Sequence, residues 1–270
     1  MRRLVVFALL VSLRALSVHA QWPPYPTPNV PRAVNGQPNL DGPAPRTPDG
    51  HPDLTGLWQY ARREGLPPRR LRALGQPEPG TDQFWDISTG MPEPIPFTPW
   101  GRETLRQRVA DDSRDNPDAH CLPLGIMQLH THPQPRRFVQ TPRLVVMLWE
   151  ANGSTRQIFT DGRPLPNNDP QPWFHGYSVG KWDGDTLVVE TIGFRDDGWL
   201  DVRGTPLTGS GKTTERFRRS NFGTLDIDVT VEDPKAYTKP WTVSIRNRLM
   251  LDSDLMEFVC QENERSSHLF

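Results

Sequence analysis

Residues 176–194, GYSVGKWDGDTLVVETIGF, contain three side-chain patterns that could do chemistry. The first is the motif Gly176-x-Ser178-x-Gly180, whose letters match the nucleophile turn of serine hydrolases. That turn needs a helix directly after the serine, whereas a run rich in β-branched residues follows here. We therefore interpret Ser178 as a strand residue and predict no serine nucleophile.

Asp183 and Asp185 flank Gly184 in the same stretch, and carboxylates at so short a spacing could bind calcium. Asp-Gly between two alternating runs is, however, a strong signal for a β-hairpin turn. No complete calcium-binding loop of the helix-loop-helix type surrounds it. We predict a turn at Asp183-Gly184 and no metal site.

Glu190 is the residue of this stretch best suited to acid-base chemistry. It shares a strand face with Val188 and Ile192, so it would be a carboxylate in an apolar interior if that face points inward. A buried carboxylate needs a cationic partner or has a raised pKa. Arg156 or Arg216 on neighbouring segments could be that partner. The alternative is a solvated face, which strands of this kind commonly have.

Two further patterns could form sites. Asp161 and Arg163 stand in the phrase FTDGR, which is either a turn held by the aspartate or part of a site at a barrel rim. His130 and His132 would project to one side of an extended segment, a spacing that suits two ligands of one metal. Surface histidines are the alternative, and we assign no metal ligand.

The candidate acids or bases are Glu190, Asp161 and His175, and the candidate ligand-binding residues are Arg156, Arg163, Tyr177, Trp182 and Arg216.

The N-terminal twenty residues predict export. MRRLVVFALLVSLRALSVHA has basic residues, an apolar run too short to span a membrane and small residues before Gln21, as a secretory signal peptide does. We expect a periplasmic or secreted protein without a membrane span. The 31 basic and 32 acidic residues are interspersed, which argues against nucleic acid as a partner. Residues 208–213, TGSGKT, lack the first glycine of a phosphate loop, and we expect no cofactor.

Cys121 and Cys260 are the two cysteines of the chain. An even number of cysteines in an exported protein favours a disulfide between them. A catalytic Cys121 beside His120 is the alternative, and it would need a reduced thiol. We predict the disulfide.

The chain divides into a signal peptide (1–20), a proline-rich arm or linker (21–52) and one β-barrel domain (53–270) with an irregular insert at about 61–136. The insert contains one short helix, which Thr98 could cap and Pro99 could begin. Strand-length segments with turn signals between them indicate an all-β fold, an antiparallel up-and-down meander that closes into a barrel of about eight to ten strands. The expected strands are 53–60, 144–150, 156–160, 177–182, 186–194, 213–218, 224–231, 241–249 and 257–260.

Two segments show this pattern most clearly. Asn152-Gly153 between the second and third expected strands is the dipeptide of a tight hairpin turn. In 224–231, apolar residues alternate with polar ones, so one face of the strand should be buried and the other solvated.

Two resemblances extend these expectations. The triplet Gly56-Leu57-Trp58 resembles the G-x-W signature of lipocalins, in which the tryptophan closes one end of the barrel. The phrases PDLTGLW, TPWG, FTDGR, SVGKWDGDTLVVETIGF, YTKPWT and EFVCQEN are similar to those of a family of uncharacterised secreted bacterial proteins. That resemblance implies membership and no activity. The family often has histidines where this chain has Leu165 and Tyr177, so it does not support a histidine mechanism at those positions.

Three functions fit the sequence. The first is an exported barrel that binds a small, largely apolar or aromatic ligand in its cavity. The alternative is a hydrolase, lyase or isomerase that uses a carboxylate or histidine with an arginine partner at the barrel mouth. The third is a surface interaction protein whose proline-rich arm docks elsewhere. The sequence does not determine the oligomeric state.

Overall fold

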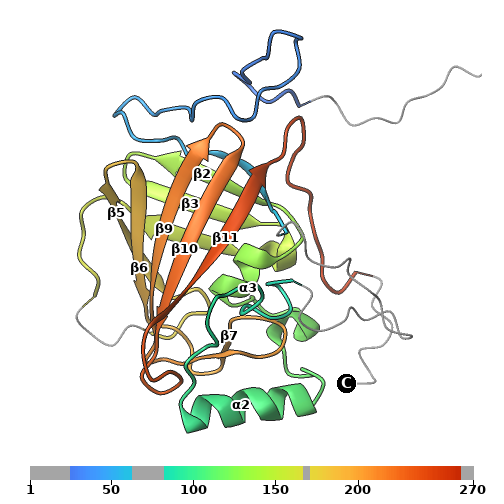
Figure 1. Ribbon diagram of the computed structural model, residues 1–270, viewed down its shortest axis with the longest axis vertical. Coiled ribbons are helices and arrows are strands. Elements are labelled where there is room, and N and C mark those ends of the chain that lie inside the picture. The colour runs from blue at the N-terminus through green and yellow to red at the C-terminus, as the bar shows by residue number, and fades with distance from the viewer. Residues whose placement is uncertain (1–24, 63–81, 167–170, 263–270) are drawn as a thin grey trace, which may run out of the picture.

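A closed barrel forms the centre of the molecule (Figure 1). The computed structural model describes residues 25–62, 82–166 and 171–262, so the predicted signal peptide lies outside the described residues. Within them, nine strands close the barrel in the order β1-β11-β10-β9-β6-β5-β4-β3-β2. The strands are β1 (Gly56–Tyr60), β2 (Arg136–Thr141), β3 (Leu144–Trp149), β4 (Thr155–Phe159), β5 (Tyr177–Asp183), β6 (Thr186–Ile192), β9 (Lys212–Asn221), β10 (Thr224–Glu232) and β11 (Trp241–Leu249).

The barrel confirms the predicted all-β class, and the pairing departs from a simple meander at two places. β4 and β5 are parallel, with Ile158 opposite Ser178, because the connection between them returns the chain along the barrel. A small hairpin of β7 (Gly198–Trp199) and β8 (Pro206–Leu207) is inserted between the neighbours β6 and β9. The other neighbouring pairs are antiparallel.

One strand prediction is wrong. Residues 257–260 form no strand, because this segment follows the last barrel strand without a backbone ladder of its own. It is held instead by the bond from Met256 N to the Glu150 carboxylate at 3.2 Å and by the disulfide that follows it.

Apolar and polar residues alternate along β10, and the apolar ones point into the barrel. Leu225, Ile227, Val229 and Val231 are fully buried, as their spacing predicts. Trp58, Phe138, Met147, Trp149 and Phe217 from other strands join them in one apolar core.

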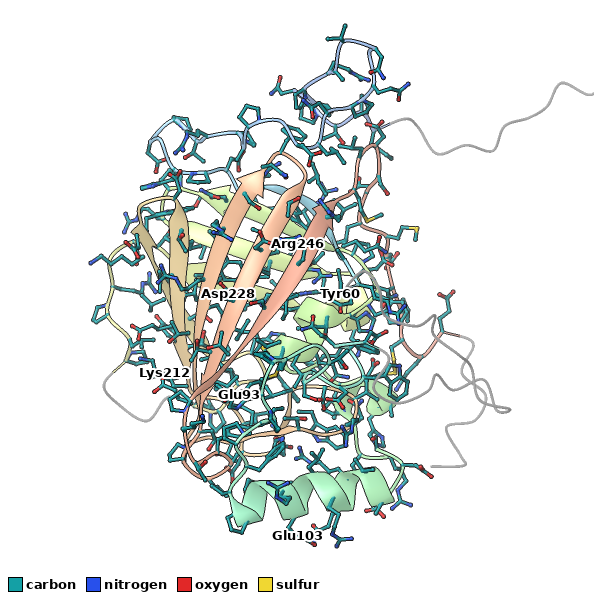
Figure 2. The ribbon with its side chains drawn as sticks, viewed as in Figure 1. Tyr60, Glu93, Glu103, Lys212, Asp228 and Arg246 are labelled. Atoms are coloured by element: carbon teal, nitrogen blue, oxygen red, sulfur yellow. A yellow bond between two sulfur atoms is a disulfide. The ribbon has the colours of Figure 1, made fainter. Side chains whose placement is uncertain are left out.

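The opposite face of the same strands is polar. Arg246 of β11 donates to Asp226 of β10 at 2.7 Å, and Ser244 donates to Asp228 (Figure 2). The interior of the barrel is therefore filled with side chains, and its outer wall on this side is charged.

Both predicted hairpin turns are present. Asn152 and Gly153 have positive φ angles of 51° and 57°, and they lie in the connection between β3 and β4, which includes the short helix η2 (Ala151–Gly153). Gly184, with φ 57°, joins β5 to β6 directly after Asp183. The Asp183-Gly184 pair is thus a turn, because these backbone angles suit glycine.

The proline-rich arm lies across one end of the barrel (Figure 1, blue segment). Phe222 N donates to Gly42 O at 2.7 Å and Gly223 N to Leu40 O at 2.8 Å, so the arm is bound to the β9–β10 turn. Below the arm, Trp58 is fully buried and donates from its indole to Leu54 O. This end of the barrel is closed.

Helix α3 (Ile126–Thr131) closes the other end, and all six of its residues are buried. Helix α2 (Pro99–Ala110) covers the molecule below it (Figure 1). As predicted, Thr98 caps α2 by accepting a hydrogen bond from Gly101 N at 3.0 Å, and Pro99 is its first residue. Within the described residues, no helix has the length and apolar composition needed to cross a membrane.

The predicted disulfide is confirmed. Cys121, at the end of the short helix η1 (Pro117–His120), is bonded to Cys260, 139 residues further along the chain. The bridge ties the segment after β11 to the region that precedes α3.

We predict that replacing both cysteines by serine lowers the free energy of unfolding by about 3–5 kcal/mol, because the open chain gains the entropy of a very long loop. Urea unfolding of the two proteins measures the difference. A change below about 1 kcal/mol would mean that the segment after β11 contributes little to the folded domain.

Candidate functional site

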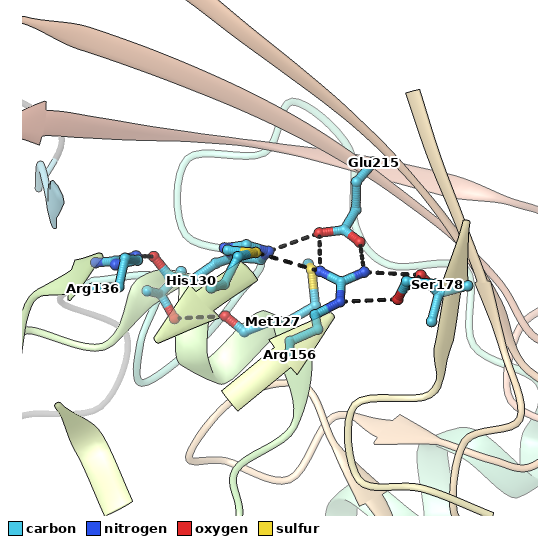
Figure 3. A network of polar contacts seen from close by, with 9 residues as sticks. Met127, His130, Arg136, Arg156, Ser178 and Glu215 are labelled. Atoms are coloured by element: carbon cyan, nitrogen blue, oxygen red, sulfur yellow. Dashed lines mark hydrogen bonds and ion pairs between the residues drawn. The ribbon is translucent and has the colours of Figure 1, made fainter. Parts of the chain in front are cut away.

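A cluster of charged and hydroxyl side chains is buried in the middle of the barrel (Figure 3). Arg156 donates from Nη1 to Oε1 of Glu215 at 3.1 Å and from Nη2 to Oε2. His130 Nε2 lies 2.7 Å from the same Oε1. Arg156 also donates to the hydroxyls of Ser178 at 3.0 Å and Thr191 at 2.9 Å. The barrel therefore encloses an ion pair together with its hydrogen-bond partners.

Five elements position this cluster. Arg156 on β4, Ser178 on β5, Thr191 on β6 and Glu215 on β9 all occupy inward-facing positions of their strands. Since β5 and β6 lie between β4 and β9, the long arginine side chain spans two strands to reach the carboxylate. Helix α3 brings His130 in from the end of the barrel. The cluster thus connects four strands and the helix that closes the barrel.

Arg156 determines the charge of Glu215. Burial alone would raise the pKa of this carboxyl, but the charge of Arg156 and the hydrogen bond from His130 outweigh it and lower the pKa of Glu215 to about 2. Burial also lowers the pKa of His130, against the opposing effect of Glu215. At neutral pH the carboxylate is ionised and the imidazole is neutral, with its proton on Nε2.

A neutral histidine oriented by a carboxylate is the arrangement of a general base. Here the imidazole is fully buried, with the ring centroids of Trp149 and Phe217 at 6.2 and 5.8 Å. The Glu215 carboxylate is likewise fully buried and bound on both oxygens. We therefore assign the cluster a structural role, in which it joins the strands through the core.

Glu190 does not lie in the interior. On β6, Leu187, Val189 and Thr191 are the buried residues, and Glu190 faces outward, where its carboxylate pairs with Lys212. The inward-facing interpretation of Glu190 is wrong. Both faces of this strand carry β-branched residues, so the sequence does not distinguish them, and in the folded barrel the face with Leu187, Val189 and Thr191 is the buried one. Its predicted partner Arg156 is indeed buried beside a glutamate, but that glutamate is Glu215.

Asp161, Arg163 and Tyr177 lie together outside the barrel. Arg163 donates to Asp161 from Nε at 2.9 Å and from Nη1 to the Tyr177 hydroxyl at 3.2 Å, while its guanidinium lies over the Phe159 ring at 3.8 Å. The hydrogen bonds from Arg163 lower the pKa of Asp161 to about 2. The FTDGR phrase is thus a turn held by its own aspartate, as one of the two interpretations predicts.

The other candidate ligand-binding residues have partners within the protein. Trp182 is stacked on His51 of the arm, with ring centroids 4.6 Å apart. Arg216 pairs with Asp183 at 3.0 Å on the outer wall. The structure does not bring them to the same place as Arg156.

His130 and His132 also separate. The segment is the end of helix α3 and not an extended strand, so His130 points to Glu215 while His132 contacts the Phe84 ring at 4.9 Å. Within the described part of the chain, no three His, Cys, Asp or Glu side chains are grouped as metal ligands.

His175 is the predicted candidate that lines an open groove, which lies beside the end of the barrel that α3 closes. Its Nδ1 contacts Thr155 O at 3.2 Å, and its ring lies 5.9 Å from that of Trp149. The groove has a volume of about 490 Å³. Its lining consists of neutral residues, Pro123, Asn152, Gly153, Ser154, Thr155, Gln171, Pro172, Trp173, Phe174 and His175.

Sequence reasoning missed Glu215 and Trp173. Glu215 alternates with Phe217 in the strand TERFRR, so the apolar neighbour on its face could have indicated that it points inward. Trp173 stands in a proline-rich connection with no periodicity, which carries no such signal.

No protein-family model matches the chain, and the search of curated proteins found no match. The resemblance to secreted bacterial proteins therefore stays a prediction, and the functional assignment rests on the geometry alone.

We predict that Glu215→Gln lowers the free energy of unfolding by about 3–5 kcal/mol, because it leaves Arg156 buried without a counter-charge. Urea unfolding measures the loss. The matched control is Glu190→Gln, which removes an exposed pairing with Lys212 and should change stability by less than about 0.5 kcal/mol. Equal effects of the two substitutions would contradict the structural role of the cluster.

We predict that His175 makes the protein less stable in acid. Burial, with a contribution from the charge of Arg156, lowers its pKa from 6.5 to about 4. The unfolded chain therefore binds the proton first, and the stability contributed above pH 6.5 is lost as the pH falls toward about 4. Thermal melting of wild type and His175→Gln across this range should show a smaller loss in the variant. Parallel curves would contradict the assignment.

Proposed function

We propose that the protein is an exported binding module, and that it holds a small ligand with a flat apolar face in the groove beside Trp173. The disulfide supports export, since such bonds persist in oxidising compartments. The filled interior argues for a site outside the barrel, because the cluster around Arg156 and the aromatic core occupy the place where a barrel would hold a ligand.

The observation that carries the proposal is the exposure of Trp173 on a fixed backbone. The side chain is 54% exposed. Its backbone is held beside Phe194, with Trp173 N donating to Gly193 O at 2.9 Å and Trp173 O accepting from Arg195 N at 3.1 Å. A tryptophan held in this way offers a large contact area without further ordering of the backbone, which favours binding.

The polar groups of the groove favour a ligand without strong charge. No charged residue is part of its lining among the described residues. Ser154 is part of the lining, and its buried hydroxyl has no hydrogen-bond partner within the described part of the chain. An aromatic wall with a few fixed polar groups is the usual composition of a small-molecule site.

We expect wild-type protein to bind the neutral fluorescent probe N-phenyl-1-naphthylamine, and Trp173→Ala to weaken the binding at least tenfold, because the flat apolar contact is lost. Fluorescence titration measures both affinities. The control is Trp100→Ala, which removes an exposed tryptophan of α2 away from the groove and should leave the affinity unchanged.

Equal affinities of wild type and Trp173→Ala, or no probe binding by the wild type, would contradict the proposed site. Mass spectrometry of small molecules that co-purify with the exported protein is an independent test. A ligand retained by wild type and lost from Trp173→Ala would support the proposed site without a surrogate probe.

A further inference from the structure

A second hollow lies between helix α2 and the β7–β8 hairpin. Its volume is about 320 Å³, at the lower end of the range of small-molecule sites. One wall is apolar and consists of Phe174, Phe194, Trp199 and Leu207. The lining also contains the charged residues Arg108, Arg195, Asp115 and Asp197, and the two arginines lie over rings of the apolar wall. We call this hollow the α2 slot.

Arg108 is the informative residue of the α2 slot. Its guanidinium lies 4.5 Å from the centroid of the Trp199 ring. Its Nη1 donates to the backbone carbonyls of Gly198 and Gly204, each at 3.0 Å, and Nη2 makes a long contact of 3.5 Å with Asp197 O. The described residues provide no hydrogen-bond partner for Nε. The edge formed by Nε and Nη2, which suits a carboxylate, is therefore largely unused.

The nearby acids do not neutralise Arg108 by direct contact. Asp197 uses both carboxylate oxygens on Arg195, at 3.0 and 3.1 Å. Asp201 is fully buried and binds the backbone amides of Ile87 and Thr205. Burial lowers the pKa of Arg108 only to about 10, so the group stays charged at neutral pH.

Asp115 lines the α2 slot from an exposed position, where water screens its charge. The α2 slot thus combines a partly buried cation, without a contacting carboxylate among the described residues, with an aromatic wall.

We propose that the α2 slot binds a small carboxylate with an apolar body. The carboxylate would accept two hydrogen bonds from the Nε–Nη2 edge of Arg108, while the apolar part would pack on Phe194 and Trp199. A side-on, bidentate contact of this kind is the strongest that a guanidinium makes with a carboxylate. The α2 slot shares only Phe174 with the groove beside Trp173, so this site does not depend on the proposed function of that groove.

The proposal is tested with phenylacetate and its neutral isostere phenylacetamide, titrated into the full chain by calorimetry. We expect phenylacetate to bind at least tenfold more tightly than the amide, because only the acid carries the charge that Arg108 pairs with. Binding should weaken as NaCl is raised. Equal binding of acid and amide, or no binding of phenylacetate at about 10 mM, would overturn the proposal.

Variants locate the binding. Arg108→Gln should lower the affinity for phenylacetate at least tenfold. Arg106→Gln is the matched control, because Arg106 lies on the same helix and pairs with Glu103, which points away from the barrel (Figure 2). Trp173→Ala should leave phenylacetate binding unchanged, which separates this site from the groove. Retained binding by a folded Arg108→Gln, or equal losses in Arg108→Gln and Arg106→Gln, would overturn the proposal.

If Arg108→Gln does not fold, NMR of the wild type shows whether phenylacetate binds in the α2 slot. Addition of phenylacetate should shift the indole signal of Trp199 and the amides of Gly198 and Gly204, while phenylacetamide should not. Shifts confined to other regions would overturn the proposal.

Discussion

The ion pair between Arg156 and Glu215 is the interaction on which the rest of the structure depends. Two opposite charges in an apolar interior are tolerated only when they contact each other and their remaining hydrogen-bonding groups are satisfied. Arg156 meets this condition through Ser178 and Thr191, and Glu215 through His130. Any shift of a strand that separated these groups would leave a charge buried alone. The pair therefore specifies the arrangement of β4, β5, β6 and β9, including the parallel pairing of β4 with β5.

The same cluster is connected to the helix that closes one end of the barrel. His130 can reach Glu215 only because α3 enters the barrel end, and the six buried residues of α3 close that opening. At the other end, Trp58 lies below the arm, with the Arg219 guanidinium 4.9 Å from its ring. A barrel of this size could hold one small ligand, but here its own side chains occupy the interior. The two hollows proposed above as sites are lined mainly by connections outside the barrel, where loops on a rigid scaffold commonly bind ligands.

Part of the candidate site followed from the sequence. Arg156 and His175 were predicted as site residues, but Arg156 lies in the buried cluster of the barrel interior and His175 lines the groove outside it. For Glu190 the sequence left two positions open, an interior carboxylate or a residue on a solvated face; the structure shows the solvated one, and Glu215 is the interior carboxylate. The two glutamates belong to neighbouring strands, and Glu190 lies opposite Thr214 in the ladder, one residue from Glu215. Adjacent residues of a strand face opposite sides, so only one of the two glutamates can be inside. Trp173 and Arg108 were not predicted. Trp173 lies in a connection and Arg108 near the end of α2, and their side chains or backbones are held by residues far along the chain.

Local patterns in the sequence determined the features whose physical causes are local. The alternation of Leu225, Ile227, Val229 and Val231 predicts a half-buried strand, and the glycines at positions 153 and 184 predict turns because few other residues adopt those angles. The tertiary structure alone decided which face of β6 is buried. Both faces carry β-branched residues, so local hydrophobicity does not distinguish them; in the folded barrel the inner face is the one with Thr191, which accepts a hydrogen bond from Arg156. The position of His130 could not be predicted from the segment LHTHP, because its partner Glu215 is 85 residues away in the sequence.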